Sequence, residues 1–397
     1  MNYQELIDQA HSMQSDLVRI RRELHQTPEF GLDLPKTLEI ILRESGDLGE
    51  VTLGKDISAA AILIKGAKPG PTVLLRADMD ALAVTEDTGL DFASTNGYMH
   101  ACGHDLHMAI GVGAARLVHA NRDKLNGNVL MFFQPGEEGH DGAGHMLAQQ
   151  MHMVSGEKPV AAYGLHVFSV VPSGIFTTKK DTMMASAGDM LVTITGRGGH
   201  GSMPWTANDP ITGMIEILST MQSFIAKNFD ALDPIIVNVG WIKAGNDHTT
   251  NIVPETVSFG ATVRSFSKKG YNETREKLTA FIKGMAEAMG LKAEVEFSPA
   301  TKVLINHHEA VDRIEAVTKQ MFGPERYMTM SQPIPGGEDY ASIVEEIPGA
   351  FIFLGAAQPG LKPEQLESNH SNKAQFDEAV LADGAALLAA LAFDKLG

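Results

Sequence analysis

The stretch VLMFFQPGEEGHD, residues 129–141, joins an apolar run to a turn rich in glycine and acidic side chains. An unbroken apolar run that is ended by Pro-Gly predicts a buried strand that stops at Gln134. Strands buried on both faces are typical of a parallel sheet covered by helices. Ligands gather at the carboxyl ends of the strands in such sheets. The acidic residues after Gln134 are therefore candidates for a functional site.

The segments on either side of this strand alternate between strand and helix periodicity. This alternation predicts an α/β domain with a largely parallel sheet. Further strands are expected at Ala60–Ile64, Thr72–Leu75, Val160–Leu165 and Ala350–Leu354, and helices at the amphipathic N-terminus (about 3–24), Leu106–His119, Ala143–Met153, about 308–321 and Gln375–Leu391.

The middle of the chain follows a different order. Its strand and helix patterns run β-α-β-β-α-β, which is a complete ferredoxin-like unit. The predicted strands are Asp189–Thr195, Ile235–Ile242, Thr256–Arg264 and Lys292–Phe297, with helices at Pro210–Ala226 and Tyr271–Met289. Because such a unit is complete in itself, we expect residues 187–300 to be an inserted domain. The first domain would then consist of residues 1–186 and 301–397.

Composition excludes several classes of partner. The formal net charge of −17 argues against binding to nucleic acid or to an anionic membrane surface. No apolar run approaches the roughly 18 residues that span a bilayer, and the N-terminal segment lacks the apolar core of a signal peptide. A single cysteine excludes an internal disulfide. We therefore expect a cytoplasmic protein that has no membrane or nucleic-acid partner.

The most concentrated chemistry lies in MHACGHDLHM, residues 99–108. If this stretch is extended, His100, Cys102 and His104 point to one side, because side chains alternate with a period of two. Asp105 would cap the helix that follows. A thiolate and an imidazole two residues apart suit a borderline-soft divalent ion such as zinc. Two ligands do not complete a site, so others must come from elsewhere.

Four more residues could complete such a site. Glu137 and Glu138 are adjacent in a loop, so one carboxylate can bind metal while the other acts as a general base. His166 ends an apolar strand, and His370 lies in the polar loop SNHSNKAQF before the last predicted helix. Each residue alone has an ordinary structural explanation. Their coincidence at strand ends of one sheet favours a metal site.

Ten motifs occur in order along nearly the whole chain. They are HQTPEFG (25–31), LLRADMDAL (74–82), MHACGHDLHM (99–108), FQPGEEG (133–139), GLHV (164–167), GRGGHGSMP (196–204), TTNIVPE (249–255), ATVRSF (261–266), GGEDY (336–340) and NHSN (369–372). Together they resemble the metal-dependent amidohydrolases that include hippurate hydrolase, aminoacylases, N-acetyldiaminopimelate deacetylase and auxin-conjugate hydrolases. This group belongs to the superfamily of carboxypeptidase G and aminoacylase-1.

The resemblance implies a role for each residue of the site. Glu137 matches the general base, and Asp80 matches an aspartate that orients a metal ligand. Asp78 stands where relatives have a metal-binding histidine, so both a structural and a catalytic role stay open for it. His100, Asp105 and His107 would support the ligands. Five residues match the ligands of two divalent ions, with Cys102 able to bridge them: Cys102, His104, Glu138, His166 and His370.

The resemblance also implies a reaction and an assembly. The reaction is hydrolysis of N-acyl amino acids, with zinc as the first expectation for the metal and manganese, cobalt or nickel as alternatives. The inserted domain would be a lid that forms a homodimer or a higher oligomer. His200 matches a histidine that reaches the scissile carbonyl of the partner subunit. Asn251 and Arg264 match residues near the substrate carboxylate.

Two other functions compete with this interpretation. The same metal centre serves dipeptidases and an N-acetyldiaminopimelate-type deacetylase, which differ only in the groups around the pocket. A catalytically silent protein with a structural metal is a more distant alternative. Closed structural zinc sites favour four Cys or His ligands, whereas this set includes a carboxylate and an adjacent glutamate.

Overall fold

The computed structural model describes residues 1–299 and 301–397, which form two compact units. The chain leaves the first unit after Met183, and the predicted domain boundary at residue 300 lies outside the described residues. Each unit is described by itself. The first consists of Met1–Met183, Ile305–Gln332 and Asp339–Gly397, and the second of Met184–Leu304 and Pro333–Glu338.

The first unit is built on an eight-stranded mixed sheet with the order β1-β2-β4-β3-β5-β16-β6-β15. Its central strands β4, β3, β5 and β16 run parallel to one another, whereas β2 is antiparallel to β4. This confirms the predicted α/β fold with a mostly parallel sheet. The strands are β1 (Glu50–Leu53), β2 (Ala60–Lys65), β3 (Lys68–Asp78), β4 (Asn126–Gln134), β5 (Ala161–Phe168), β6 (Phe176–Thr178), β15 (Tyr327–Thr329) and β16 (Gly349–Gly355).

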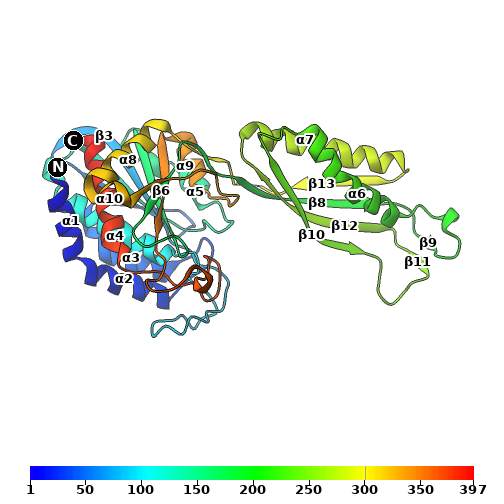
Figure 1. The fold of residues 1–397 in the computed structure, drawn as a ribbon, viewed down its shortest axis with the longest axis horizontal. Coiled ribbons are helices and arrows are strands. Elements are labelled where there is room, and N and C mark those ends of the chain that lie inside the picture. Colours follow the sequence, from blue (N-terminus) through cyan, green and yellow to red (C-terminus); the bar gives the residue numbers. More distant parts are fainter. Residues whose placement is uncertain (300) are drawn as a thin grey trace. The chain divides into compact units, whose positions relative to one another are not determined.

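Helices cover both faces of this sheet (Figure 1). On one face, α4 (His104–Ala120) and α10 (Val380–Leu396) pack together, and they are buried almost all round because α1 (Tyr3–Ser12) and α2 (Gln14–Gln26) cover them. Burial on all sides explains why both helices are apolar around their whole circumference. The other helices of this unit are α3 (Pro35–Ser45), α5 (Gly142–Ala148), α8 (His308–Phe322) and α9 (Tyr340–Glu346).

The opposite face of the sheet carries polar groups into the interior. Arg76 pairs with Gly164, and Asp78 with Gln134, so these side chains share one face with His166, two residues beyond Gly164. Helix α9 packs on this face, since a Cβ at Gly164 would lie 3.1 Å from the Tyr340 ring. The functional residues therefore start from one face of the sheet, near its strand ends.

The second unit contains a four-stranded antiparallel sheet in the order β10-β12-β8-β13. The helices α6 and α7 pack against it, and the order along the chain is β8-α6-β10-β12-α7-β13. This is the ferredoxin-like connectivity. The elements are β8 (Ser186–Thr195), α6 (Pro210–Asn228), β10 (Ile235–Ala244), β12 (Thr256–Ser265), α7 (Lys268–Ala288) and β13 (Lys292–Phe297).

Two short pairs of strands complete the structure. β9 (Gly199–His200) pairs with β11 (Ile252–Val253), and β7 (Asp181–Met184) with β14 (Leu304–Asn306). Within the described residues, no helix is both long enough and apolar enough to cross a membrane.

Several predicted helix bounds were wrong. The N-terminal helix is divided into α1 and α2 around Met13. The helix predicted at Ala143–Met153 ends at Ala148, and a separate 3₁₀ turn follows at Met151–Met153. The last helix begins at Val380 instead of Gln375. In each case apolar residues of the neighbouring loop continue the helical spacing without continuing the helix.

Candidate metal centre and active site

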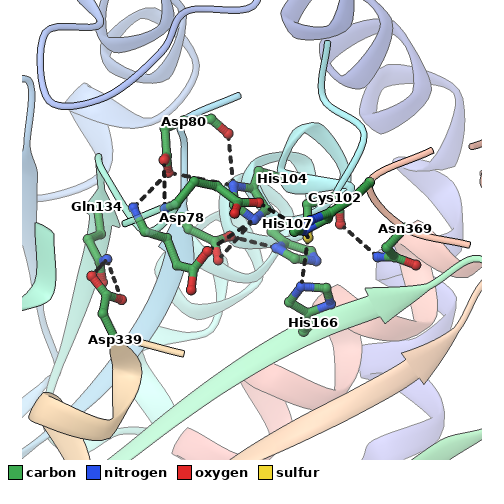
Figure 2. Close-up of polar contacts among 12 residues, drawn as sticks. Asp78, Asp80, Cys102, His104, His107, Gln134, His166, Asp339 and Asn369 are labelled. Carbon is green, nitrogen blue, oxygen red and sulfur yellow. Dashed lines mark hydrogen bonds and ion pairs between the residues drawn. The ribbon is translucent and has the colours of Figure 1, made fainter. Parts of the chain in front are cut away.

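Three neighbouring strands end at the same edge of the first sheet. In the last pair between β3 and β4, Asp78 lies opposite Gln134. Pairing of β3 with β5 stops at Arg76 and Gly164, whereas β5 continues beside β16 as far as Phe168. The last residues of β5 therefore have one edge that is open to side chains from elsewhere. The candidate site lies where β5 extends beyond its pairing with β3 (Figure 2).

One group of possible metal ligands consists of Cys102, His104 and His166. Their ligand atoms all lie within 4.8 Å of one another, and all three residues are buried. The Cys102 Sγ lies 3.3 Å from His166 Nε2. His166 itself lies inside β5, two residues before the end of the strand, and not after the strand as predicted.

A second group consists of Cys102, Glu138 and His370, again within 4.8 Å of one another. His370 Nε2 lies 3.2 Å from Cys102 Sγ and 3.2 Å from Glu138 Oε1. The hydrogen bonds to Cys102 and Glu138 raise the pKa of His370 to about 10. Cys102 is common to both groups, so the structure brings together the five residues predicted as ligands, with the sulfur in the shared position.

The ring nitrogens in this cluster are arranged to receive a cation. His104 Nδ1 lies 2.8 Å from the Asp80 carbonyl, and His166 Nδ1 lies 2.8 Å from the Val167 carbonyl. Because a carbonyl only accepts, each Nδ1 carries a hydrogen and each Nε2 faces the cluster. His104 Nε2 is buried and has no hydrogen-bond partner among the described residues.

The electrostatics of the cluster also favour a cation. Burial lowers the pKa of His104, but Asp78, Asp80 and Cys102 together outweigh this effect, and the pKa lies well above its usual value. Asp78 Oδ2 lies 3.6 Å and Glu137 Oε2 4.0 Å from His104 Nε2. Negative charge therefore surrounds a nitrogen that makes no hydrogen bond among the described residues, which suits a metal ion. The donor set of imidazole, thiolate and carboxylate is the one that borderline divalent metals prefer. The residues present therefore fit two divalent ions.

Asp80 fixes the two adjacent glutamates. Its Oδ1 accepts the backbone N–H of Glu137 at 2.9 Å, and its Oδ2 accepts that of Glu138 at 3.0 Å. Glu138 reaches His370, whereas Glu137 Oε2 lies 4.0 Å from His104 Nε2. Glu137 thus lies outside both groups that contain Cys102, and it forms a further group with His104 and Glu138 at the edge of the cluster. Asp80 was predicted to orient a metal ligand, and it holds His104 through its backbone carbonyl and the glutamates through its carboxylate.

The backbone around Cys102 forms a tight turn instead of the extended stretch predicted from side-chain alternation. Gly103 has φ +88°, and α4 begins at the next residue, His104. A Cβ at Gly103 would lie 2.5 Å from Val167 Cγ2, so a side chain at this position would displace the end of β5. Glycine here is required both by the left-handed conformation and by close packing.

Asp105 does not cap α4, as was predicted, because the helix begins one residue before it. Its Oδ2 lies 2.8 Å from His25 Nδ1 and 2.6 Å from Arg21 Nε, and all three side chains are buried. Burial raises the pKa of Asp105, but Arg21 and His25 outweigh it and hold the pKa well below its usual range. This ion network supports the first turn of α4 from behind.

His100 belongs to none of the ligand groups. The residue is buried, and neither ring nitrogen has a hydrogen-bond partner among the described residues. Burial lowers its pKa to about 3, so the ring is neutral at physiological pH. Its proximity to Cys102 in the sequence therefore does not place it in the site.

The geometry around Asp78 gives it a structural role. Its Oδ2 accepts from Arg76 at 2.5 Å, and its Oδ1 lies 2.6 Å from His107 Nδ1. His107 Nε2 accepts the N–H of Val167 at 2.8 Å, so Nδ1 carries the proton and donates to Asp78. Although Asp78, His104 and His107 lie close enough for a metal, both nitrogens of His107 are already used. Burial raises the pKa of Asp78, but Arg76 and both histidines hold it well below its usual value.

A second buried carboxylate shares the same guanidinium. Asp339 accepts from Arg76 at 3.0 Å, from Gln134 at 2.8 Å and from the Ala143 N–H at 3.0 Å. Burial nevertheless raises its pKa to about 6. Arg76 therefore helps to hold the pKa of Asp78 low, but it does not offset the effect of burial on the pKa of Asp339. Pairing of this kind is what allows an arginine to be fully buried.

The predicted substrate residues lie in the second unit. His200 pairs with Ile252 in the β9–β11 pair, and the Gly201 N–H donates to the Asn251 carbonyl at 2.7 Å. His200 and Asn251 are therefore neighbours, and both are exposed. The His200 Nδ1 lies 3.0 Å from the Ser202 hydroxyl.

Arg264 is not brought together with these two residues. It lies near the end of β12, and Asn251 lies before the start of this strand. The eight steps along the strand from Thr256 to Arg264 alone span roughly 26 Å at about 3.3 Å per residue. The Arg264 side chain donates to the Val263 carbonyl at 3.0 Å. Within one chain, Arg264 and Asn251 therefore cannot hold the same carboxylate.

Sequence reasoning missed the residues that support the ligands from behind. Arg76, Gln134 and Asp339 form one buried network, and Asn369 bonds to the turn at Cys102. Arg76, Asp339 and Asn369 lie inside motifs that carried the resemblance, so the signal was present. Residue type alone does not distinguish a buried amide or guanidinium from a solvated one.

Comparison with known proteins agrees with this site. Residues 74–394 match the model of "Peptidase family M20/M25/M40". Thermostable carboxypeptidase 1 of Saccharolobus solfataricus is 32% identical over 98% of both chains. N-acetyldiaminopimelate deacetylase of Priestia megaterium is 31% identical over 89% of this chain and 93% of the relative. IAA-amino acid hydrolase ILR1-like 2 of Arabidopsis thaliana is 31% identical over 96% of this chain and 85% of the relative.

A solved structure extends the likeness to the fold. The YXEP protein of Bacillus subtilis, described as a dinuclear metal binding peptidase from the M20 family, has a TM-score of 0.82 and 28% sequence identity. The match covers 97% of this chain and 99% of YXEP. The family and its hydrolase members argue against the catalytically silent alternative. This chain belongs to peptidase family M20/M25/M40, and it is a metal-dependent amidohydrolase.

Proposed function

We propose that this protein hydrolyses the amide bond of N-acyl amino acids and releases a carboxylic acid and a free amino acid. The proposal rests on the different positions of two adjacent glutamates relative to the ligand groups. Glu138 belongs to a ligand group with Cys102 and His370, whereas Glu137 lies outside both groups that share the sulfur. A carboxylate next to a metal centre, but not needed to hold it, is the arrangement expected of a general base.

Two divalent ions are assigned to the two groups that share Cys102. One group is Cys102, His104 and His166, and the other is Cys102, Glu138 and His370. Zinc is the first expectation from the donor set, and manganese, cobalt or nickel are alternatives. When bound, such ions would supply Lewis acidity toward a water molecule and toward the amide carbonyl.

Glu137 carries the proton through the reaction. Its carboxylate takes a proton as a water oxygen forms a bond to the amide carbon. It then delivers this proton to the amide nitrogen as the carbon–nitrogen bond breaks, which leaves a free amine. The hydrogen bonds from the N–H groups of Glu137 and Glu138 to Asp80 hold this loop still while the proton moves. Such positioning lowers the entropic cost of the step.

Residues of the second unit are proposed to bind the substrate. His200 would donate to the oxyanion that develops on the carbonyl, and Arg264 and Asn251 would bind the carboxylate of the amino acid. Because β12 separates Arg264 from the other two, the residues of one chain cannot surround one substrate. A homodimer in which His200 and Asn251 complete the partner's site meets this requirement. The lid role of the unit and the cytoplasmic location stay predictions.

Two related activities are the alternatives. The carboxypeptidase relative suggests a peptidase that acts on dipeptides, and the deacetylase relative suggests N-acetyldiaminopimelate. Both reactions use the same proton transfer by Glu137. They differ in the acyl group and in the amine that leaves, so the choice depends on residues around the pocket.

A substrate panel tests the proposal. Amino-acid release is measured from N-acetyl, N-benzoyl and long-chain N-acyl amino acids beside dipeptides, with and without a chelator. Release from acyl amino acids that the chelator abolishes is the expected result. Cleavage confined to dipeptides would replace the proposal with a peptidase, and cleavage of N-acetyldiaminopimelate alone would replace it with that deacetylase.

A further inference from the structure

The side-chain amide of Asn369 makes hydrogen bonds to several backbone groups inside the site. Its Nδ2 donates to the Cys102 carbonyl at 3.1 Å and to the Val167 carbonyl at 2.9 Å. Its Oδ1 accepts the Ser169 N–H at 3.0 Å and lies 3.0 Å from the Ser169 hydroxyl. The Ser169 hydroxyl has a single hydrogen and lies closer to the Glu367 carbonyl, at 2.7 Å, so the amide has three hydrogen-bond partners: the two carbonyls and the Ser169 N–H.

These bonds join three segments that each carry a candidate metal ligand. Cys102 precedes α4, Val167 follows His166 in β5, and Asn369 directly precedes His370. The three segments are far apart in the sequence, and the Asn369 amide bonds to the backbone of the other two. Figure 2 shows Asn369 beside the Cys102 turn, with His166 on the neighbouring strand.

The end of β5 depends on such bonds. The pairing with β3 has stopped at Gly164, so Val167 has no strand partner on that edge. His107 accepts the Val167 N–H, and Asn369 donates to the Val167 carbonyl. The N–H and the carbonyl of Val167, the residue after His166, are thus both hydrogen-bonded to side chains. A buried backbone group without a hydrogen bond would destabilise the fold.

The backbone at His370 shows that its position is imposed from outside. Its φ of +72° is a left-handed conformation that is strained for a residue with a side chain. Its N–H donates to the Ala101 carbonyl at 2.9 Å, next to the Cys102 turn. Surrounding contacts must hold this conformation, and the amide of Asn369 is the nearest of them in the sequence.

We propose that Asn369 is a positioning residue that fixes Cys102, His166 and His370 relative to one another, so that the metal-binding cluster is preformed. The proposal rests on the ligand assignment given above. Partners of this kind, which hold ligands without touching the metal, typically contribute 10–100-fold to metal affinity. We therefore expect Asn369 to act on metal affinity and on ligand geometry.

Asn369→Asp is the most direct test, because it keeps the shape and replaces the donor with a second acceptor. Two carboxylate oxygens cannot donate to the carbonyls of Cys102 and Val167. The matched control is Asn372→Asp, which adds the same charge three residues further along. Asn372 is exposed, and its side chain makes no hydrogen bond in the part of the chain that the structure describes. It differs from Asn369 only in lacking the bonds that the proposal invokes.

Cobalt binding to the full chain provides readouts that do not depend on activity. Metal-free wild type and both variants are titrated with Co²⁺ against a competing chelator, and the sulfur-to-cobalt absorption is recorded. We expect Asn369→Asp to bind Co²⁺ about 10–100-fold more weakly, with a shifted spectrum, and Asn372→Asp to match wild type. An affinity within about twofold of wild type and an unchanged spectrum for Asn369→Asp would overturn the proposal.

A second variant keeps the test decisive if Asn369→Asp does not fold. Asn369→Ala removes both donor bonds without adding a charge. It should weaken Co²⁺ binding several-fold, and unchanged binding would overturn the proposal. The ligand assignment fails separately: wild type without any sulfur-to-cobalt absorption would overturn that assignment and this proposal with it. Turnover on the substrate panel is measured independently of both.

Discussion

The ligand cluster and the β9–β11 pair are both predicted to touch the substrate, yet they are built in opposite ways. Cys102, His104 and His166 are buried, and each is held by bonds to neighbouring backbone or side chains. His200 and Asn251 lie on a pair of two-residue strands and are exposed. The first region is therefore preformed, whereas the second presents its side chains on the surface.

The largest effect is expected from the general base. Glu137→Gln should lower kcat by about 10²–10⁴-fold while metal content stays at the wild-type level, because general-base catalysis contributes this much. The measurements are steady-state kinetics and metal analysis on the same preparation. Glu138→Gln is the control, since it should lose metal as well. A Glu137→Gln enzyme with more than about a tenth of wild-type kcat would contradict the assignment.

The β9–β11 pair should contribute to turnover but not to stability. His200→Ala should lower kcat by about 10²–10³-fold, which is the usual effect of removing an oxyanion donor. Its melting temperature should stay unchanged because the side chain is exposed. A fall in melting temperature with little loss of turnover would reverse the contrast between the two regions.

Mixing two inactive variants shows whether His200 acts across a dimer. When His200→Ala and Glu137→Gln subunits are exchanged in equal amounts, half of the dimers are mixed, and one of their two sites is complete. Activity should then recover to about one quarter of wild type. His200→Ala mixed with His200→Ala, Glu137→Gln double-mutant subunits is the control. No recovery above this control would mean that His200 serves its own chain or no site at all.

A smaller effect is expected where the ligand cluster is supported indirectly. Asp80→Asn keeps one acceptor for the N–H groups of Glu137 and Glu138 and replaces the other with a donor. This change should lower kcat/KM by about 10–100-fold, as for other residues that hold ligands in place. The matched comparison is Asp141→Asn, which alters an exposed carboxylate a few residues after the glutamates. Equal effects of both changes would show that the loop needs no fixed anchor.

The smallest effect concerns pH and stability. Burial raises the pKa of Asp339 to about 6, above the ordinary value of 3.8. The folded state therefore keeps this proton where the unfolded chain loses it, and stability falls as the pH rises from about 4 to 6. Asp339→Asn should remove this slope, which is worth roughly 3 kcal/mol at most. Urea unfolding of both proteins between pH 4 and pH 7 measures it, and parallel pH profiles would contradict it.

The sequence predicted the sheet well and singled out side chains that the structure brings together, and both results have physical reasons. Unbroken apolar runs such as Val129–Phe133 have few alternatives to a buried strand, and metal-binding residue types stand out at strand ends. The prediction failed where a turn depends on tertiary contacts. Gly103 adopts a left-handed conformation against Val167, and no pattern near residue 102 predicts where β5 will end.

The supporting residues were hidden for a related reason. Arg76 looks like an ordinary charge in a strand until its partners Asp78 and Asp339 are known, and Asp339 lies 263 residues away in the sequence. Asp105 has the residue type of a helix cap, but buried Arg21 and His25 use its carboxylate instead. The roles of Arg76 and Asp105 depend on charged partners that are distant in the sequence. The spacing of residues within a motif does not reveal such partners.

The position of β16 has a consequence for the order in which the molecule is made. This strand lies between β5 and β6, in the interior of the first sheet, although it comes from residues 349–355. During synthesis the ribosome releases Cys102, Glu137 and His166 long before β16, α10 and His370. The ferredoxin-like unit can fold first, since domains generally fold as units. A nascent chain therefore holds most of the catalytic residues for many seconds before the sheet that aligns them can close.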